Sequence, residues 1–244
     1  MRLLRLSREQ RLKAWRLVRR PRLLPILFYR IVPSLEHVDV RFGEAATVLD
    51  VGASRGQFAT LIRHLQPHAR IVCFEPLPAA LDTLRRVGAR FRFEVHAAAL
   101  GEQQGTAPLY VTTHDDSSSM LPMTERMVAE FEGMDRAGTA EVATRRLDDL
   151  DLAISRPCLL KIDAQGSELR VLHGAAMTLR EIDEAYIECS FVELYEGQPL
   201  AAEVIALMLE AEFFIVGIHN IARGRDGTQH QVDIHFRRDS LVGP

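Results

Sequence analysis

The sequence predicts an α/β fold built on one open, mostly parallel β-sheet of seven strands. Short apolar runs alternate along the chain with segments whose apolar residues recur at helical spacing, which is typical of successive βα units. The last two apolar runs are joined only by the glycine-containing link IARGRDGTQH, residues 221–230. This link is too short to contain a helix, so we expect a hairpin and an antiparallel final strand.

The elements follow in order from these patterns. The expected strands are 47–51, 70–75, 92–100, 158–163, 184–191, 212–220 and 231–236. The expected helices are 56–66, 78–87, 167–180 and 200–211. Because most of these strands are continuously apolar, both faces of the sheet should be covered, with helices on each side.

A basic extension, residues 1–45, precedes the expected domain at 46–240. Residues 1–35 contain ten Lys or Arg and one Glu, although the whole chain has a formal net charge of −3. The stretch MRLLRLSREQRLKAWRLVRR predicts a basic amphipathic helix. Such a helix either makes peripheral contact with an anionic membrane or packs on the domain with its arginines in solvent, and the second arrangement is the more common.

Residues 105–150 form an insertion between the third and fourth core strands. TAPLYVTT and AEVATRRLDDL predict strands on either side of the polar HDDSSSM and the helix-like LPMTERMVAEFEG. An insertion at this edge would serve as a lid over the site and select the substrate, with Ser118 and Ser119 as candidate contacts. The alternative is a flexible surface loop.

Composition favours a cytoplasmic location. The three cysteines form no C-x-x-C pair and lie in apolar strand-like runs, which predicts reduced buried thiols. No apolar run is long enough to span a bilayer, and the N-terminus has no uninterrupted signal-peptide core. Only the basic extension is a candidate for contact with the inner face of the membrane.

The stretch VLDVGASRGQFA, 48–59, runs from the first strand through two glycines into a helix. In open α/β sheets a ligand binds beyond the carboxyl ends of the strands, at such a turn. We expect Gly52 and Gly56 to leave room for that ligand. Glu75 ends the second strand, 23 residues after Gly52, where an acidic side chain can bind both ribose hydroxyls.

The same turn disfavours a dinucleotide. A pyrophosphate would need glycine at the position that Ser54 occupies, and the carboxylate of Asp50 would repel it. Asp50 would instead suit a cationic amino-acid group. S-adenosylmethionine has a ribose, an ammonium and a sulfonium and no phosphate, so the turn predicts S-adenosylmethionine as the cofactor.

Several motifs resemble the FkbM family of methyltransferases, in the same order along the chain. They are VLDVGASRGQFA, CFEPLP, AAALG, DDSSSM, RRLDDL, LLKIDAQGSELRVLHGA and VELYEGQP, and the resemblance covers roughly residues 46–237. It implies a Rossmann-like class I fold and S-adenosylmethionine-dependent methyl transfer, commonly to a hydroxyl of a sugar, glycolipid or natural product.

The resemblance also implies a cofactor site. The residues that fall on it, with their neighbours, are Asp50, Gly52, Ala53, Ser54, Gly56, Glu75, Pro76 and Ala98. One position departs from the family: an Asn is frequent where this chain has Ala97. Recognition of the adenine by a side chain is not expected there, and backbone groups would serve.

Asp163 is the first candidate for the catalytic base, because it ends the fourth strand at the same edge as the cofactor turn. Its alternative role is to cap the following helix. Glu188, a charged residue inside an apolar strand, is the second catalytic candidate. Glu193, just beyond that strand, is a candidate substrate contact.

No metal site is predicted. His230 and His235 are an odd number of residues apart and should face opposite sides of one strand. The expected partner is a small-molecule or glycan acceptor, and the acidic remainder of the chain argues against nucleic acid. The rival hypotheses are a non-catalytic Rossmann-like binding module and a nicotinamide-dependent oxidoreductase. The sequence predicts no oligomeric state.

Overall fold

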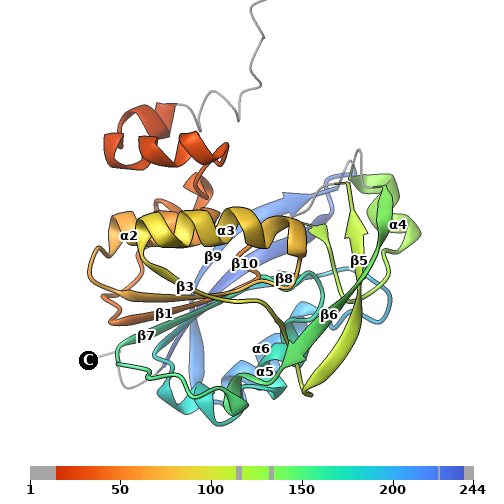
Figure 1. The fold of residues 1–244 in the computed structure, drawn as a ribbon. Coiled ribbons are helices and arrows are strands. Elements are labelled where there is room, and N and C mark those ends of the chain that lie inside the picture. Colours follow the sequence, from red (N-terminus) through yellow and green to blue (C-terminus); the bar gives the residue numbers. More distant parts are fainter. Residues whose placement is uncertain (1–14, 114–116, 132–134, 225, 239–244) are drawn as a thin grey trace, which may run out of the picture.

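The computed structural model describes residues 15–113, 117–131, 135–224 and 226–238. Its centre is a seven-stranded sheet with the order β3-β2-β1-β7-β8-β10-β9 (Figure 1). The strands are β1 Thr47–Val51, β2 Arg70–Phe74, β3 Phe93–His96, β7 Cys158–Ile162, β8 Glu184–Ser190, β9 Phe213–Arg223 and β10 Gln229–Arg238.

The predicted antiparallel ending of this sheet is confirmed. Strands β3, β2, β1, β7 and β8 pair in parallel. Strand β10 is antiparallel to both of its neighbours, β8 and β9. The hairpin formed by β9 and β10 therefore folds back so that its second strand lies inside the sheet and its first strand forms the edge.

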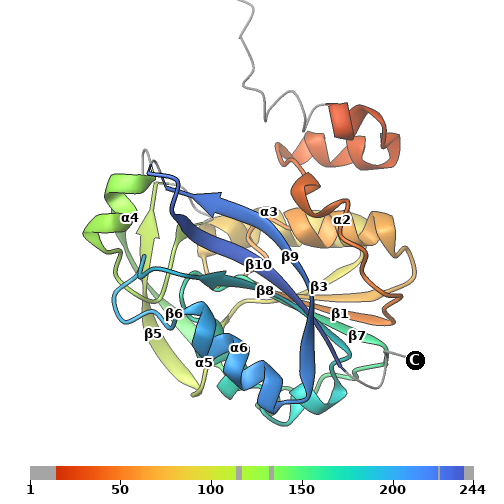
Figure 2. The same cartoon turned by 180° about the vertical axis from the view of Figure 1, so that it is seen from behind.

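Helices cover both faces of the sheet, as expected (Figures 1 and 2). Helices α2 Gln57–Leu65 and α3 Pro78–Phe91 lie on one face, and α5 Glu168–His173 and α6 Ala201–Glu210 lie on the other. Every residue of β1 and β7 is buried. Because successive strand residues face opposite ways, Val48 joins the core beneath α2 and α3, while Leu49 packs in the core that includes α5 and α6.

Two predicted elements outside the insertion were wrong in extent. The stretch 92–100 is not one strand, since β4 Ala99–Leu100 leaves the main sheet and pairs with β6 in a second sheet. The helix expected over 167–180 ends after His173 and is followed by the 3-10 turn η5 Thr178–Glu181. At that break Gly174 lies so close to the carbonyl oxygen of Gly101 that a Cβ atom would overlap it.

The insertion forms a small three-stranded sheet together with β4, in the order β4-β6-β5. Strands β5 Gly105–Thr112 and β6 Arg136–Arg145 pair antiparallel, and 3-10 turn η4 Leu147–Asp149 follows. The helix expected over 121–133 is only the short α4 Glu125–Glu130. Thr124 caps α4, because its Oγ1 accepts a hydrogen bond from the amide of Met127 at 3.3 Å.

Residues 15–29 lie on the outer side of α2 (Figures 1 and 2). Residues 15–18 are helical, followed by the 3-10 helix η1 Pro21–Tyr29 and the turn η2 Leu35–His37. The rest of the predicted basic helix, 1–14, lies outside the described residues. Within the described part of the chain, no helix combines the length and apolarity needed to cross a bilayer. The three cysteines are free and buried, as predicted.

Candidate active site

A cavity of about 310 Å³ opens at the carboxyl ends of β1, β2 and β7, where ligands bind in open α/β sheets. Its volume is at the lower end of the range of small-molecule sites, roughly 300–1,000 Å³. The predicted site residues that line it are Gly52, Ala53, Ser54, Glu75, Pro76, Ala98, Ser118 and Asp163. The sequence-based prediction therefore locates this cavity, although several residues have other roles than expected.

The two glycines of the first turn are required by the backbone and its packing. Gly52 has φ +73°, and a Cβ there would lie 1.8 Å from the carbonyl oxygen of Asp163. Gly56 has φ +91°, and its Cβ would lie 3.1 Å from Leu84 of α3. This corrects the expectation that both glycines clear space for a ligand. Gly52 lines the cavity with its backbone, and Gly56 does not reach it.

Glu75 is held in place by the turn it faces. Its Oε2 accepts a hydrogen bond from the amide of Ser54 at 2.7 Å, and its Oε1 accepts one from the amide of Leu77 at 2.7 Å. Burial raises the pKa of Glu75 to about 7, with the two amide bonds opposing the rise. Because a carboxylate oxygen has more than one acceptor site, Glu75 can still accept hydroxyl donors from a ligand in the cavity.

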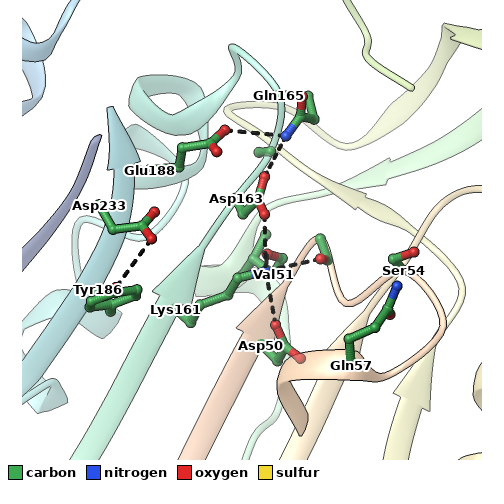
Figure 3. A network of polar contacts seen from close by, with 12 residues as sticks. Asp50, Val51, Ser54, Gln57, Lys161, Asp163, Gln165, Tyr186, Glu188 and Asp233 are labelled. Atoms are coloured by element: carbon green, nitrogen blue, oxygen red, sulfur yellow. Dashed lines mark hydrogen bonds and ion pairs between the residues drawn. The ribbon is translucent and has the colours of Figure 1, made fainter. Parts of the chain in front are cut away.

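Asp50 does not face the cavity. Its carboxylate is fully buried behind the turn, with Oδ1 3.2 Å from Nζ of Lys161 (Figure 3). Lys161 lines the cavity instead, and its ammonium donates to the carbonyl of Gly52 at 3.0 Å. The expectation that Asp50 contacts a cationic ligand is therefore corrected, because the ammonium group of Lys161 already lies beside its carboxylate.

Sequence reasoning missed Lys161, although a lysine inside the apolar strand CLLKI was a signal that a buried charge needs a partner. Burial lowers the pKa of Lys161, but Asp50 and Asp163 more than offset this, so its pKa lies above the usual lysine value. Burial raises the pKa of Asp50 against the opposing charge of Lys161. The lysine therefore brings a fixed positive charge to the floor of the cavity.

Asp163 faces the cavity with a side chain that is 38% exposed. Its Oδ1 accepts a hydrogen bond from Nε2 of Gln165 at 2.6 Å, and its Oδ2 lies 3.7 Å from Nζ of Lys161. Asp163 is not the helix cap that was the alternative. The amides of the loop before α5 are bound by Glu168, whose Oε1 accepts from Ala164 and Gly166 at 3.0 Å each.

Gln165, a second residue that the sequence did not suggest, links Asp163 to the surrounding polar groups (Figure 3). Its Nε2 also donates to Glu188 at 3.2 Å, and its Oε1 accepts from the hydroxyl of Tyr195 at 2.6 Å. Gln165 has φ +49°, a left-handed conformation that a non-glycine residue adopts at a cost. The turn thus aims its amide at both carboxylates.

Glu188 lies behind Asp163 and does not line the cavity. Its Oε2 accepts hydrogen bonds from Gln165 and, at 3.0 Å, from Gln231 of β10. Burial and the nearby charge of Asp163 raise its pKa well above the usual value. The structure thus supplies the partners that a charged residue inside an apolar strand requires, and places Glu188 as a support for Gln165.

The three predicted substrate contacts separate. Ser118 lines the cavity. Ser119 is buried beneath it, where its Oγ donates to the carbonyl of Gln165 at 2.6 Å and accepts from the amide of Leu121 at 3.0 Å. Glu193 is exposed on a neighbouring loop and accepts from the amide of Gly197 at 2.6 Å. Ser119 therefore joins the insertion to the Asp163 loop, and Glu193 lies outside the cavity.

The N-terminal segment forms one wall of the cavity, which sequence reasoning missed. Val32, Pro33, Ser34, Glu36 and His37 all line it. The Nδ1 of His37 lies 3.2 Å from the hydroxyl of Tyr186 and 2.8 Å from Nδ2 of Asn220. No periodicity in residues 1–45 could have indicated this contact, because it depends on strands that come more than a hundred residues later.

His37 belongs to a buried polar network under that wall. The Tyr186 hydroxyl donates to Oδ2 of Asp233 at 3.1 Å, and Asn220 donates to the same oxygen at 2.8 Å. Burial lowers the pKa of His37, against the opposing effect of Asp233. Burial therefore favours the neutral form of this imidazole.

The histidines of β10 are not part of this site. His235 packs within the sheet, with its Nε2 3.2 Å from Oε2 of Glu184. Among the described residues no cluster of three or more His, Cys, Asp or Glu side chains has an arrangement that could hold a metal ion.

A known family model matches most of the chain. The family model described as the methyltransferase FkbM domain matches residues 50–215, which include the glycine turn, Glu75, Asp163 and Glu188. The chain belongs to the FkbM methyltransferase family. This membership confirms the predicted family and S-adenosylmethionine as its cofactor.

Relatives of this methyltransferase span most of its length. The 2-O-methyltransferase NoeI of Sinorhizobium fredii is 30% identical over 208 residues, which cover 81% of this chain and 83% of NoeI. Methyltransferase sdnD of Sordaria araneosa is 27% identical over 197 residues, covering 69% and 73% of the two chains.

A solved structure supports the fold. The crystal structure of methyltransferase FkbM from Methylobacillus flagellatus superposes with a TM-score of 0.50 at 20% identity. The match covers 80% of this chain and 45% of that one, so this chain spans less than half of that protein. The predicted Rossmann-like fold is thus confirmed by the sheet order and by this similarity.

Proposed function

We propose that this methyltransferase transfers the methyl group of S-adenosylmethionine to a hydroxyl oxygen of a sugar, glycolipid or natural product. One observation carries the proposal: two carboxylates, Glu75 and Asp163, face the same cavity from the ends of β2 and β7. The relative NoeI is described as a 2-O-methyltransferase, which supports oxygen as the acceptor atom. The 310 Å³ cavity contains no glycine-rich phosphate cradle, since Ser54 stands in the turn.

The residues present suit the cofactor. Glu75 would accept hydrogen bonds from the ribose hydroxyls, because its carboxylate is fixed by the amides of Ser54 and Leu77 and lines the cavity. Pro76 and Ala98 would flank the adenosine, as they line the cavity beside Glu75. The bound cofactor supplies an electrophilic methyl group on its sulfonium.

The chain's own contribution is alignment and removal of a proton. In-line displacement depends on holding the acceptor oxygen opposite the leaving sulfur, and such positioning supplies much of the rate. The Asp163 carboxylate is oriented by the Gln165 amide at Oδ1. Its Oδ2 remains available to accept the hydroxyl proton as the oxygen–carbon bond forms. Lys161, with its Nζ 3.7 Å from Oδ2, places a positive charge beside this carboxylate.

The experiment is methyl transfer from S-adenosylmethionine to a panel of hydroxyl-bearing oligosaccharides and lipids, with the Asp163→Asn variant. The substitution keeps size and removes the charge, so turnover should fall by roughly 10²–10⁴-fold, the contribution of a general base. Cofactor affinity should stay nearly unchanged.

A matched control is Asp149→Asn, because the Asp149 side chain is 41% exposed and pairs with Arg146 away from the cavity. This variant should turn over at the parent rate. Equal turnover of the Asp163→Asn variant and the parent would remove Asp163 as the base. A product methylated only at nitrogen would overturn the assignment of a hydroxyl acceptor. Cofactor binding without any methyl transfer would favour the non-catalytic module.

A further inference from the structure

Six large apolar side chains in the segment before β1 face solvent. They are Trp15, Val18, Leu24, Leu27, Phe28 and Val32, here called the N-terminal apolar surface, and their exposed fractions range from 40% at Leu24 to 90% at Phe28. Single exposed apolar residues are normal on a protein, but a concentration of them indicates a surface that something else covers.

Other side chains of the segment anchor it to the fold. In η1, Leu23 and Ile26 are buried, 1% and 0% exposed, in clusters that also contain Leu61 and Phe58 of α2. These inward residues anchor the segment. Leu24, Leu27 and Phe28 occupy the outward positions of the same 3-10 helix. Because the inner side already has its core, the apolar character of the outer side requires a separate explanation.

The charge of the segment indicates what covers it. Residues 15–35 contain five arginines and no Asp or Glu, in a chain whose net charge is −3. Arg16 is paired within the fold, 2.7 Å from Asp39, whereas Arg19 and Arg30 are exposed. The Arg19 guanidinium lies 4.2 Å from the centre of the Trp15 ring, so a cation and an apolar ring are presented together. Apolar side chains beside arginines are typical of surfaces that bind the interface of anionic lipid bilayers.

The N-terminal apolar surface shares one residue, Val32, with the cavity lining. Val32 is 46% exposed as part of the N-terminal apolar surface and also lines the cavity, followed by Pro33 and Ser34. The segment stands on the outer side of α2, away from the insertion (Figures 1 and 2). Docking through this segment would therefore bring one wall of the cavity next to the docked surface.

We propose that the N-terminal apolar surface docks this methyltransferase on an anionic membrane, with the cavity opening beside the lipid headgroups. Apolar side chains enter the headgroup boundary, and the exposed Arg19 and Arg30 bind lipid phosphates. The contact is peripheral, and it does not depend on methyl transfer, so it can be measured without cofactor or acceptor.

The test is co-sedimentation of the full chain with vesicles of phosphatidylcholine alone or mixed with phosphatidylglycerol. The protein should sediment with the mixed vesicles at low salt, and added salt should release it because exposed charges are screened. The double variant Leu27→Ser/Phe28→Ser should bind these vesicles about tenfold or more weakly, as expected for losing two buried apolar side chains.

Leu209→Ser is the control, since Leu209 lies on α6 at the opposite face of the sheet and is 53% exposed. It should bind vesicles like the parent, and all proteins should have the same circular dichroism spectrum. Failure of the parent to sediment with anionic vesicles at low salt would overturn the proposal, as would equal binding by the double variant. A dimer that dissociates in the double variant, without vesicle binding, would identify a second copy as the occupant.

Discussion

Replacing Lys161 with Met should leave one carboxylate buried without its counter-ion. Asp50 is fully buried, the Lys161 side chain is 8% exposed, and the two charged groups are 3.2 Å apart. Removing one partner of a buried ion pair costs about 3–5 kcal/mol, because the other charge remains desolvated. The melting temperature should fall by about 10 °C or more, given about 2–4 °C per kcal/mol for a domain of this size.

A double-mutant cycle isolates the charge effect. Lys161 also donates to the carbonyls of Val51 and Gly52, and those bonds are lost whether or not residue 50 is charged. In an Asp50→Asn background, Lys161→Met should therefore cost about 2–3 kcal/mol less than it does alone, near the upper limit for contacting residues. Urea denaturation followed by circular dichroism measures all four proteins. Arg70→Met is the control, because its surface pair with Glu94 should contribute less than about 1 kcal/mol.

The pH dependence supplies an independent check. Burial raises the folded-state pKa of Asp50, and Lys161 opposes this rise, so the substitution should raise that pKa further. A carboxyl with a raised folded pKa favours folding while protonated and loses that contribution as pH rises through the folded pKa. The cost of Lys161→Met should thus shrink as pH falls from neutral towards the ordinary aspartate range. A cost of Lys161→Met no larger than that of Arg70→Met would refute the reasoning. So would a cost that changes neither with pH nor in the Asp50→Asn background.

Two further predictions concern the cofactor turn. Gly52→Ala should destabilise the fold more than Gly197→Ala in thermal melts. Both glycines have φ near +70°. A Cβ at position 52 would lie 1.8 Å from the Asp163 carbonyl oxygen, whereas a Cβ at position 197 would have no atom within 4 Å. The control should cost only the left-handed strain, roughly 1–2 kcal/mol, and equal losses would contradict the close packing. Burial raises the pKa of Glu75 to about 7, so hydroxyl donors from a bound ribose should lower this pKa and release a proton. Calorimetry near pH 7 in buffers of different ionisation enthalpy should detect the release, and Glu75→Gln should abolish it. Unchanged release in that variant would assign the proton to another group.

Local sequence patterns predicted the main sheet well, because apolar periodicity and short links follow directly from burial and turn geometry. The β9–β10 hairpin is the clearest case, since a ten-residue glycine-containing link leaves few alternatives. The division of 92–100 into β3 and β4 could not be foreseen. It depends on Ala99 pairing with Thr144, a contact across 45 residues of chain.

The location of a site residue was predicted where its place at a strand end decides whether it faces the cavity, as for Glu75 and Asp163. It was not predicted where roles depend on neighbours distant in sequence. Asp50 was assigned to the ligand because nothing near it in the sequence indicates its partner, Lys161, which lies on β7. Likewise, His37 approaches the cavity only because Tyr186, Asn220 and Asp233 form a polar site that receives it.

Calorimetric binding of S-adenosylmethionine, S-adenosylhomocysteine and NAD to the parent and to Glu75→Ala tests the account most directly. The parent should bind the first two ligands and not NAD, because its turn lacks the phosphate cradle. Glu75→Ala should weaken the binding of S-adenosylmethionine and of S-adenosylhomocysteine by roughly 1–3 kcal/mol, the cost of hydrogen bonds lost from a charged group. The surface control Glu94→Ala should bind both ligands like the parent. Tight NAD binding, or unchanged affinity in Glu75→Ala, would contradict the assignment of this cavity to S-adenosylmethionine.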